Sequence, residues 1–218
     1  MLDALVIPVG ATPSSAVIWL HGLGADGHDF APIVTELGLP PQLSVRFIFP
    51  HAPMMPVTIN NGYVMPAWYD IRNQHLGQAE DEMGIRASQR QLEELIQHEV
   101  ARGIPVSRIV LAGFSQGGAI ALHTALRFNS PLAGVLALST YLPLPENIAE
   151  AHPANAGLPI FMAHGTTDSI IDLAHASTSR DVLQQNGYAV TWYEYVMAHS
   201  LCPEEITDIG KWLAQTLS

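Results

Sequence analysis

Short apolar runs alternate along this chain with longer stretches of mixed polarity, and this alternation predicts its secondary structure. Runs such as 16–20 are apolar throughout, which is typical of strands buried on both faces of a sheet. Residues 5–9 contain Pro8, whose missing N–H suits an edge strand. The further predicted strands are residues 45–49, 109–112, 134–138, 159–163 and 190–196.

Helical patterns fill the stretches between these runs. The longest, 80–102, has an acidic start, and acidic side chains are favourable near the positive end of a helix dipole. Strands that alternate with helices, without a break in composition, predict a mostly parallel sheet covered by helices on both faces. We expect a single α/β domain over residues 1–218. The other predicted helices are residues 30–37, 119–127, 172–186 and 203–217.

Two stretches lack a regular pattern. Residues 50–79 contain Asn61-Gly62 between two apolar triplets, which is a hairpin signal. Residues 139–158 are rich in proline and are expected to form a loop. Both begin where a predicted strand ends, the place where open α/β sheets bind ligands. We interpret them as walls of a pocket, with ordinary surface connections as the alternative.

Charge and cysteine content exclude several classes of function. The net charge is −11 and the basic residues form no cluster, which disfavours binding to nucleic acid or to anionic membrane surfaces. No apolar stretch approaches the ~18 residues of a spanning helix, so no stable membrane insertion is expected. Cys202 is the only cysteine, and residues 1–10 lack a basic region of the kind that opens a signal peptide. The cytoplasm is therefore the expected compartment.

The most informative local pattern is Gly-x-Ser-x-Gly at residues 113–117. It directly follows the β-branched run 109–112 and precedes an Ala/Leu-rich helical pattern. This context predicts a sharp strand-to-helix turn with Ser115 at its apex, where the hydroxyl is presented as a nucleophile. The alternative is a Gly/Ser turn that merely starts a helix.

A serine nucleophile needs a base, and the base needs an acid that orients it. On a strand–turn–helix scaffold these partners follow in the order serine, acid, histidine, each just past a strand. Asp168 is the first acidic residue after the run 159–163, and His199 directly follows the last predicted strand. Asp172 is the alternative to Asp168 as the acid, but a role in capping the following helix accounts adequately for an aspartate at position 172. We predict Ser115, Asp168 and His199 as a catalytic triad.

Acyl transfer also requires backbone donors that stabilise the developing oxyanion. Gln116 follows the nucleophile, and the glycine-rich loop 21–27 follows an early strand, so we expect the N–H groups of Gln116 and Leu23 to form the oxyanion hole. The loop lacks the Lys-Ser/Thr ending of a phosphate-binding loop. No metal site is expected, because the chain has no His-Glu-x-x-His motif and only one thiol. Cys202 has no nucleophile-turn context and is interpreted as incidental.

With these residues assembled, the chain resembles the phospholipase/carboxylesterase family of the α/β-hydrolase superfamily, which includes acyl-protein thioesterases and lysophospholipases. The resemblance implies the same triad and oxyanion hole, an acyl groove lined by Leu23, Tyr141, Leu142 and Ile171, no cofactor and no large cap domain. It also allows a homodimer formed through a face near the active site. The matching stretches are residues 17–26, 66–71, 111–118, 138–143, 164–168 and 195–199.

Three functions remain open from the sequence. The first is a serine carboxylesterase that hydrolyses small-molecule esters with short to medium acyl chains through an acyl-enzyme intermediate. The second keeps the chemistry but acts on long acyl chains, as an acyl-protein thioesterase or a lysophospholipase. The third is a non-catalytic binding module, which is disfavoured because every catalytic role has a residue to fill it.

Overall fold

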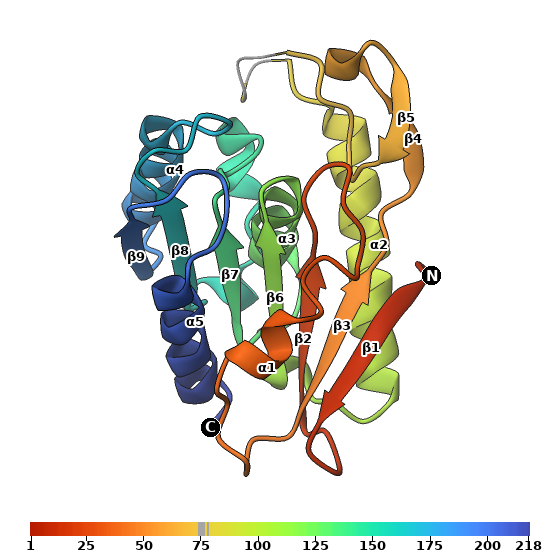
Figure 1. The fold of residues 1–218 in the computed structure, drawn as a ribbon, viewed down its shortest axis with the longest axis vertical. Helices are drawn as coiled ribbons and strands as arrows, with labels where there is room; N and C mark the ends of the chain where they lie inside the picture. Colours follow the sequence, from red (N-terminus) through yellow and green to blue (C-terminus); the bar gives the residue numbers. More distant parts are fainter. Residues whose placement is uncertain (74–76, 78) are drawn as a thin grey trace.

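A mostly parallel sheet forms the centre of the computed structural model, which describes residues 1–73, 77 and 79–218 (Figure 1). Within these residues seven strands pair in the order β1-β3-β2-β6-β7-β8-β9. All neighbours pair in parallel except β1, which runs antiparallel to β3. Strand β1 lies at the edge of the sheet, the position that Pro8 predicts. The strands are β1 (Ala4–Val9), β2 (Ser15–Leu20), β3 (Val45–Pro50), β6 (Ile109–Phe114), β7 (Gly134–Leu138), β8 (Ile160–Gly165) and β9 (Val190–Tyr195).

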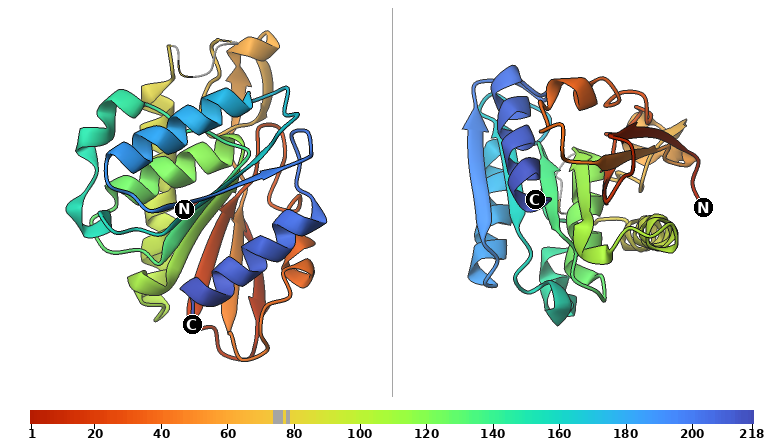
Figure 2. Two further views of the ribbon diagram at one scale, coloured as in Figure 1. Left: turned by 90° about the vertical axis from the view of Figure 1, so that its left-hand side faces the viewer. Right: turned by 90° about the horizontal axis from the view of Figure 1, so that it is seen from below.

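Helices cover both faces of the sheet, as predicted (Figure 2). One face carries α1 (Ile33–Glu36) and α5 (Pro203–Thr216), and the other carries α2 (Glu82–Ala101), α3 (Gln116–Arg127) and α4 (Leu173–Gln185). Strand β2 shows why its run is apolar throughout: Val17 and Trp19 pack on the α1/α5 side, whereas Ile18 and Leu20 pack on the α2/α3 side. Alternate side chains therefore enter two different cores.

The predicted hairpin forms β4 (Met54–Val57) and β5 (Tyr63–Pro66), a separate two-stranded sheet beside the carboxyl ends of the central strands (Figure 1). A short 3₁₀ turn, η1 (Thr58–Asn60), lies between them. Asn61 and Gly62 adopt φ values of 55° and 75°, so the dipeptide supplies the left-handed backbone that closes the turn. The Asn-Gly signal is confirmed, with a longer connection than a two-residue turn.

Two expectations need adjustment. Helix α3 begins at Gln116 rather than at 119, because the nucleophile turn passes into the helix without an intervening loop. Residues 139–158 contain two 3₁₀ segments, η3 (Pro145–Glu150) and η4 (Pro153–Asn155), in which proline occupies the first turn. The 3₁₀ segment η2 (Val106–Arg108) leads into β6. None of the described helices combines the length and apolar character needed to cross a bilayer.

Candidate active site

Ser115 occupies a strained turn between β6 and α3. Its backbone has φ 55° and ψ −123°, a conformation that side-chain-bearing residues rarely adopt and that the surroundings must enforce. Its N–H donates to Leu138 O at 2.9 Å, and its carbonyl accepts the N–H of Ala119 at 3.1 Å and the hydroxyl of Thr140 at 2.6 Å. The predicted serine turn is thus held by the end of β7 as well as by its own helix.

The glycines of the motif permit close packing around this turn. A Cβ at Gly113 would lie 2.3 Å from the carbonyl group of Gly117, and one at Gly117 would lie 2.5 Å from the carbonyl oxygens of Leu20 and His21. Such distances leave no space for a methyl group. Glycine is therefore required at both positions because α3 packs directly against β6 and β2. This packing holds Ser115 at the carboxyl end of the sheet.

Asp168 and His199 meet although 31 positions separate them. Nδ1 of His199 lies 2.7 Å from Oδ2 of Asp168, whose side chain is buried. The other carboxylate oxygen accepts the N–H groups of Ile170 and Ile171 at 2.8 and 3.0 Å. The carboxylate is thus fixed by its own turn and can hold the imidazole with Nδ1 protonated, which leaves Nε2 free to act as a base.

His199 is also positioned from the side of the nucleophile. The ring of Phe114, the residue before Ser115, packs against the His199 ring with centroids 4.7 Å apart. In the described structure the hydroxyl of Ser115 makes no hydrogen bond to His199. Hydrogen bonds between nucleophile and base are commonly long before substrate binds, so this geometry is compatible with the predicted pair.

His164 is a second histidine at the acid, and the sequence reasoning did not select it. Its Nε2 donates to Ile171 O at 2.8 Å and lies 3.4 Å from Oδ2 of Asp168. Burial lowers the pKa of His164, so the ring remains neutral at physiological pH. Its place at the end of β8, four residues before Asp168, was the available signal. It braces the turn that carries the acid.

The two predicted oxyanion donors are free to act. No hydrogen bond within the described residues uses the N–H of Leu23 or of Gln116. The loop that carries Leu23 lies close to Ser115, since a Cβ at Gly22 would lie 3.3 Å from the Phe114 ring and 3.5 Å from Cβ of Ser115. Leu23, Gln116 and Ser115 border the same cavity. Unused donors beside a nucleophile are what an oxyanion hole requires.

The side chain of Gln116 has a separate structural role that sequence reasoning missed. It accepts the backbone N–H of Trp68 at 2.8 Å and donates to Tyr69 O at 2.7 Å. The indole N–H of Trp68 in turn donates to His21 O at 2.8 Å, and Trp68 O accepts the hydroxyl of Ser88. The nucleophile turn, the glycine-rich loop and the segment 66–70 are therefore joined by a buried hydrogen-bond network.

His21 belongs to the same network. Its Nδ1 lies 2.8 Å from Gly22 O, and its Nε2 accepts the N–H of Ala52 at 3.1 Å. This pairing requires a proton on Nδ1 and none on Nε2, and burial lowers the pKa of His21 accordingly. A neutral His21 therefore ties the glycine-rich loop to the end of β3.

A cavity of about 290 Å³ opens beside Ser115. Of the predicted acyl-groove residues, Leu23, Tyr141 and Ile171 line it, but Leu142 does not. The side chain of Leu142 is buried in the α2/α3 core instead, and its N–H donates to Ser179. The remaining lining residues are Ile59, Asn60, Tyr69, Ile71, Asn73, Ser115, Gln116 and Ile170.

Two tyrosines give one wall of this cavity a polar edge. Their hydroxyl oxygens, on Tyr69 and Tyr141, lie 2.9 Å apart. Burial raises the pKa of both phenols, and burial also raises the pKa of the nearby carboxyl of Glu80. The residues that line the cavity include no Asp, Glu, Lys, Arg or His, and most are apolar or aromatic, which suits an acyl chain better than a charged ligand.

Cys202 lies at the N-cap of α5. Burial raises the pKa of its thiol, which keeps it protonated and weakly nucleophilic at neutral pH. This environment agrees with its interpretation as incidental to catalysis.

Comparison with known proteins places the chain among hydrolases. The sequence model of the phospholipase/carboxylesterase family matches residues 2–217. An acyl-protein thioesterase 1 from Neurospora crassa is 43% identical over 98% of this chain and 91% of its own length. Another from Yarrowia lipolytica is 39% identical over 98% of this chain and 97% of its own length.

Solved structures agree with these relatives. SOBER1 of Arabidopsis thaliana superposes with a TM-score of 0.88 at 28% identity, covering 94% of this chain and 99% of that one. Acyl-protein thioesterase 2 of Zea mays superposes with a TM-score of 0.87 at 28% identity, covering 100% of both chains. With its α/β-hydrolase fold, and with no large cap among the described residues, this chain belongs to the phospholipase/carboxylesterase family.

Proposed function

We propose that this protein is a serine thioesterase that releases acyl groups from cysteine residues of proteins, with Ser115 as nucleophile. The observation that carries the chemistry is the buried Asp168 carboxylate, fixed by two backbone N–H groups and 2.7 Å from Nδ1 of His199. A carboxylate that is prearranged in this way orients a histidine base toward a serine. The strained backbone of Ser115 is the second support.

The proposed reaction has two steps. Ser115 Oγ attacks the acyl carbon while Nε2 of His199 takes the hydroxyl proton, and the N–H groups of Leu23 and Gln116 stabilise the oxyanion. The tetrahedral intermediate formed by this attack then collapses and breaks the acyl–sulfur bond, and His199 gives the proton to the leaving thiolate. Water then attacks the acyl-enzyme with His199 as base, which releases the carboxylic acid and regenerates Ser115.

The choice of a protein-bound thioester follows from the relatives. The proteins named acyl-protein thioesterase 1 match nearly the whole chain at 39–43% identity. Ser115 borders the cavity together with Ile59, Ile170 and Ile171, and the side chains of Ile59 and Ile170 are exposed. An acyl chain in that cavity would leave the thiol side of the substrate at the surface, where a protein can be accommodated.

One observation favours a second candidate function, hydrolysis of small-molecule esters with short to medium acyl chains. The cavity volume of about 290 Å³ is at the lower end of the range of roughly 300–1,000 Å³ found for ligand pockets. The paired hydroxyls of Tyr69 and Tyr141 border it, and extending an alkyl chain past them would require displacing a hydrogen bond.

A matched substrate series separates these functions. Initial rates would be measured on acyl-cysteine peptides, oxygen esters and lysophospholipids that carry C4, C8 or C16 chains. A higher kcat/KM on the C16 peptide thioester than on C4 esters supports the thioesterase. A preference for C4 oxygen esters selects the carboxylesterase, and a preference for C16 lysophospholipid selects a lysophospholipase.

The nucleophile is tested independently of the substrate. Ser115→Ala should lose labelling by a fluorophosphonate probe and lower turnover by several orders of magnitude, whereas Ser107→Ala, an exposed serine in η2, should behave as the wild-type chain. Undiminished labelling of Ser115→Ala would refute the assignment. Failure of the wild-type chain to label would favour the binding module.

A further inference from the structure

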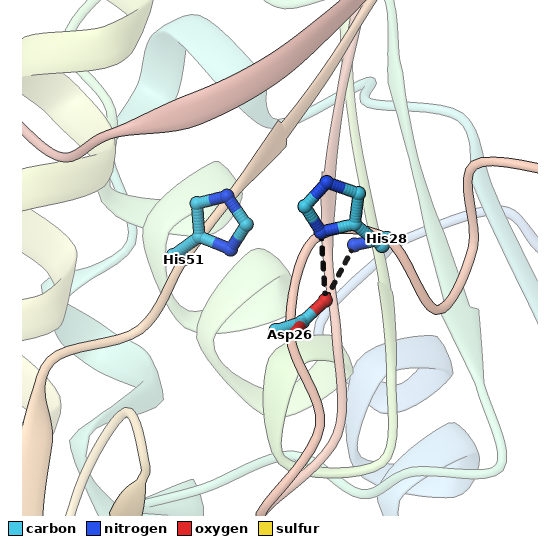
Figure 3. A group of neighbouring side chains, drawn as sticks. All are labelled: Asp26, His28 and His51. Carbon is cyan, nitrogen blue, oxygen red and sulfur yellow. Dashed lines mark hydrogen bonds and ion pairs between the residues drawn. The ribbon is translucent and has the colours of Figure 1, made fainter.

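Asp26, His28 and His51 form a cluster that the proposed catalytic chemistry does not use. Asp26 and His28 lie on the loop that follows β2, and His51 directly follows β3. One potential ligand atom from each side chain lies within 4.8 Å of those of the other two. Figure 3 shows that both imidazole rings turn a nitrogen toward the Asp26 carboxylate.

Hydrogen bonds already arrange this cluster. Oδ1 of Asp26 accepts the backbone N–H of His28 at 2.7 Å and lies 3.2 Å from Nδ1 of the same residue. Nδ1 of His51 accepts the N–H of Gly27 at 3.1 Å, so this nitrogen carries a lone pair directed at the loop. The two rings lie with centroids 5.4 Å apart. A lone pair on nitrogen is what a metal ion requires from histidine.

The backbone at Gly27 brings the two segments together. A Cβ there would lie 2.4 Å from Phe49 O and 3.1 Å from the His51 ring, so only glycine lets the loop approach β3 this closely. Asp26 and His28 flank this contact and are exposed. The cluster is therefore both accessible from solvent and held at a defined separation.

From this geometry we propose that Asp26, His28 and His51 bind a divalent transition-metal ion of the zinc class. Two imidazoles and one carboxylate form a donor set of borderline softness, which suits Zn²⁺ or Co²⁺ rather than Mg²⁺ or Ca²⁺, whose preferred ligands are all oxygen. Three protein ligands leave at least one coordination position for water. When the ion binds, it replaces two interactions: the contact between the Asp26 carboxylate and Nδ1 of His28, and the hydrogen bond from the Gly27 N–H to Nδ1 of His51.

The charges around the cluster favour a cation. The cluster itself contributes the carboxylate of Asp26, and Asp29 follows on the same loop. The chain as a whole has a net charge of −11. A bound ion would join the loop that carries Leu23 to the end of β3, and none of its three ligands lines the cavity beside Ser115.

This site departs from the expectation that the chain holds no metal. The sequence argument searched for ligands at short, regular spacing within one element, such as His-Glu-x-x-His. Here His51 is separated from His28 by the whole of α1 and β3. The convergence of the three residues arises from the parallel pairing of β2 with β3, which places the segments that follow them side by side.

Titration calorimetry with Zn²⁺ on the full-length chain, free of any histidine tag, tests the proposal. We expect one Zn²⁺ per chain, and a loss of affinity of at least about tenfold in Asp26→Asn, His28→Ala and His51→Asn. His98→Ala is the matched control, because His98 lies beside the carboxylate of Glu99 but belongs to no group of three potential metal ligands among the residues that the structure describes. Thermal unfolding would verify that each variant is folded.

A spectroscopic readout makes the result specific to coordination. Co²⁺ should give visible absorption bands in the wild-type and His98→Ala chains that weaken in the three site variants, and excess Mg²⁺ should not displace it. Zn²⁺ binding that is unchanged in the site variants, or Mg²⁺ that displaces Co²⁺, would overturn the proposal. Ser115→Ala should bind Zn²⁺ as the wild type does, so failure of the catalytic proposal would leave this result unaffected.

Discussion

The side-chain carbonyl of Gln116 accepts the backbone N–H of Trp68 at 2.8 Å, and this contact joins the nucleophile turn to the segment that borders the cavity. The same side chain donates to Tyr69 O at 2.7 Å, so one amide satisfies two buried backbone groups. The backbone N–H of Gln116 remains available as a proposed oxyanion donor. The side chain of Gln116 thus holds the architecture together, while its backbone N–H is left for the proposed role in the reaction.

Replacing this side chain should destabilise the protein. Gln116→Leu leaves the N–H of Trp68 and the carbonyl of Tyr69 without partners, and each unpaired buried group costs roughly 1–3 kcal/mol. Urea unfolding should show a lower free energy of unfolding than in Gln185→Leu, an exposed glutamine on α4. Equal stability of the two variants would mean that the network does not contribute as proposed.

Exchanging the acid for its amide should affect activity far more than stability. In Asp168→Asn the Oδ1 position can still accept the N–H groups of Ile170 and Ile171, so the turn is retained. The amide group that then faces His199 no longer favours a proton on Nδ1, and kcat should fall by up to about 10⁴-fold. Steady-state kinetics and thermal unfolding would be compared on the same sample. A variant that keeps wild-type kcat would exclude Asp168 from the triad.

Gly117 of the serine motif and Gly157, which lies outside the motif, differ sharply in the space around them. A Cβ at Gly117 would lie 2.5 Å from the carbonyl oxygens of Leu20 and His21, whereas nothing lies within 4 Å of one at Gly157. Gly117→Ala should therefore force α3 away from β2 and lower the free energy of unfolding by roughly 1–3 kcal/mol or more. Gly157→Ala should leave the free energy of unfolding unchanged. Denaturant melts of both variants measure the difference, and comparable melts would contradict the packing argument.

A buried carboxyl on α5 should make stability depend on pH between about 4.5 and 8. Glu205 is fully buried, and burial raises the pKa of its carboxyl from 4.5 to about 8. The folded chain therefore holds a proton that the unfolded chain releases near 4.5. The contribution of this bound proton to the free energy of unfolding is fully present below pH 4.5 and is lost as pH rises through about 8.

Glu205→Gln should remove that dependence. Across the interval from pH 4.5 to 8, the wild-type chain should lose stability relative to the variant by an amount on the order of a few kcal/mol. Urea unfolding at pH 5, 7 and 9 measures it, with the exposed neighbour Glu204→Gln as control. Parallel pH profiles for wild type and Glu205→Gln would show that Glu205 ionises normally in the folded chain.

Much of the fold was predictable because its signals are local. Apolar runs such as 16–20 mark buried strands, Pro8 marks an edge, and Asn61-Gly62 marks a hairpin, each for a reason confined to a few residues. Element ends were less certain. Helix α3 begins at Gln116 because the turn and the helix share backbone, which hydrophobic periodicity cannot show.

The arrangement of the proposed triad was also predictable, for a topological reason. Parallel strands bring their carboxyl ends to one edge of a sheet, so residues that follow β6, β8 and β9 meet there. Asp168 and His199 are joined as that rule predicts, although their catalytic roles, like that of Ser115, stay predictions. No such rule predicts which residues line the acyl groove, since Tyr141 lines the cavity while its neighbour Leu142 is buried in the core.

The sequence by itself thus determined the parallel sheet, the serine turn and the edge of the sheet at which chemistry is expected. Those features depend on side-chain periodicity, on glycine at strained positions and on the order of the strands along the chain, and all three can be read from the sequence. Only the tertiary structure decided the Gln116 network, the position of His164 against Asp168, and the convergence of His28 with His51. The Gln116 and His28–His51 contacts join segments far apart in sequence, and their geometry depends on how whole elements pack. His164 and Asp168 are only four positions apart, but hydrophobic periodicity does not show the fold of the turn that brings them together.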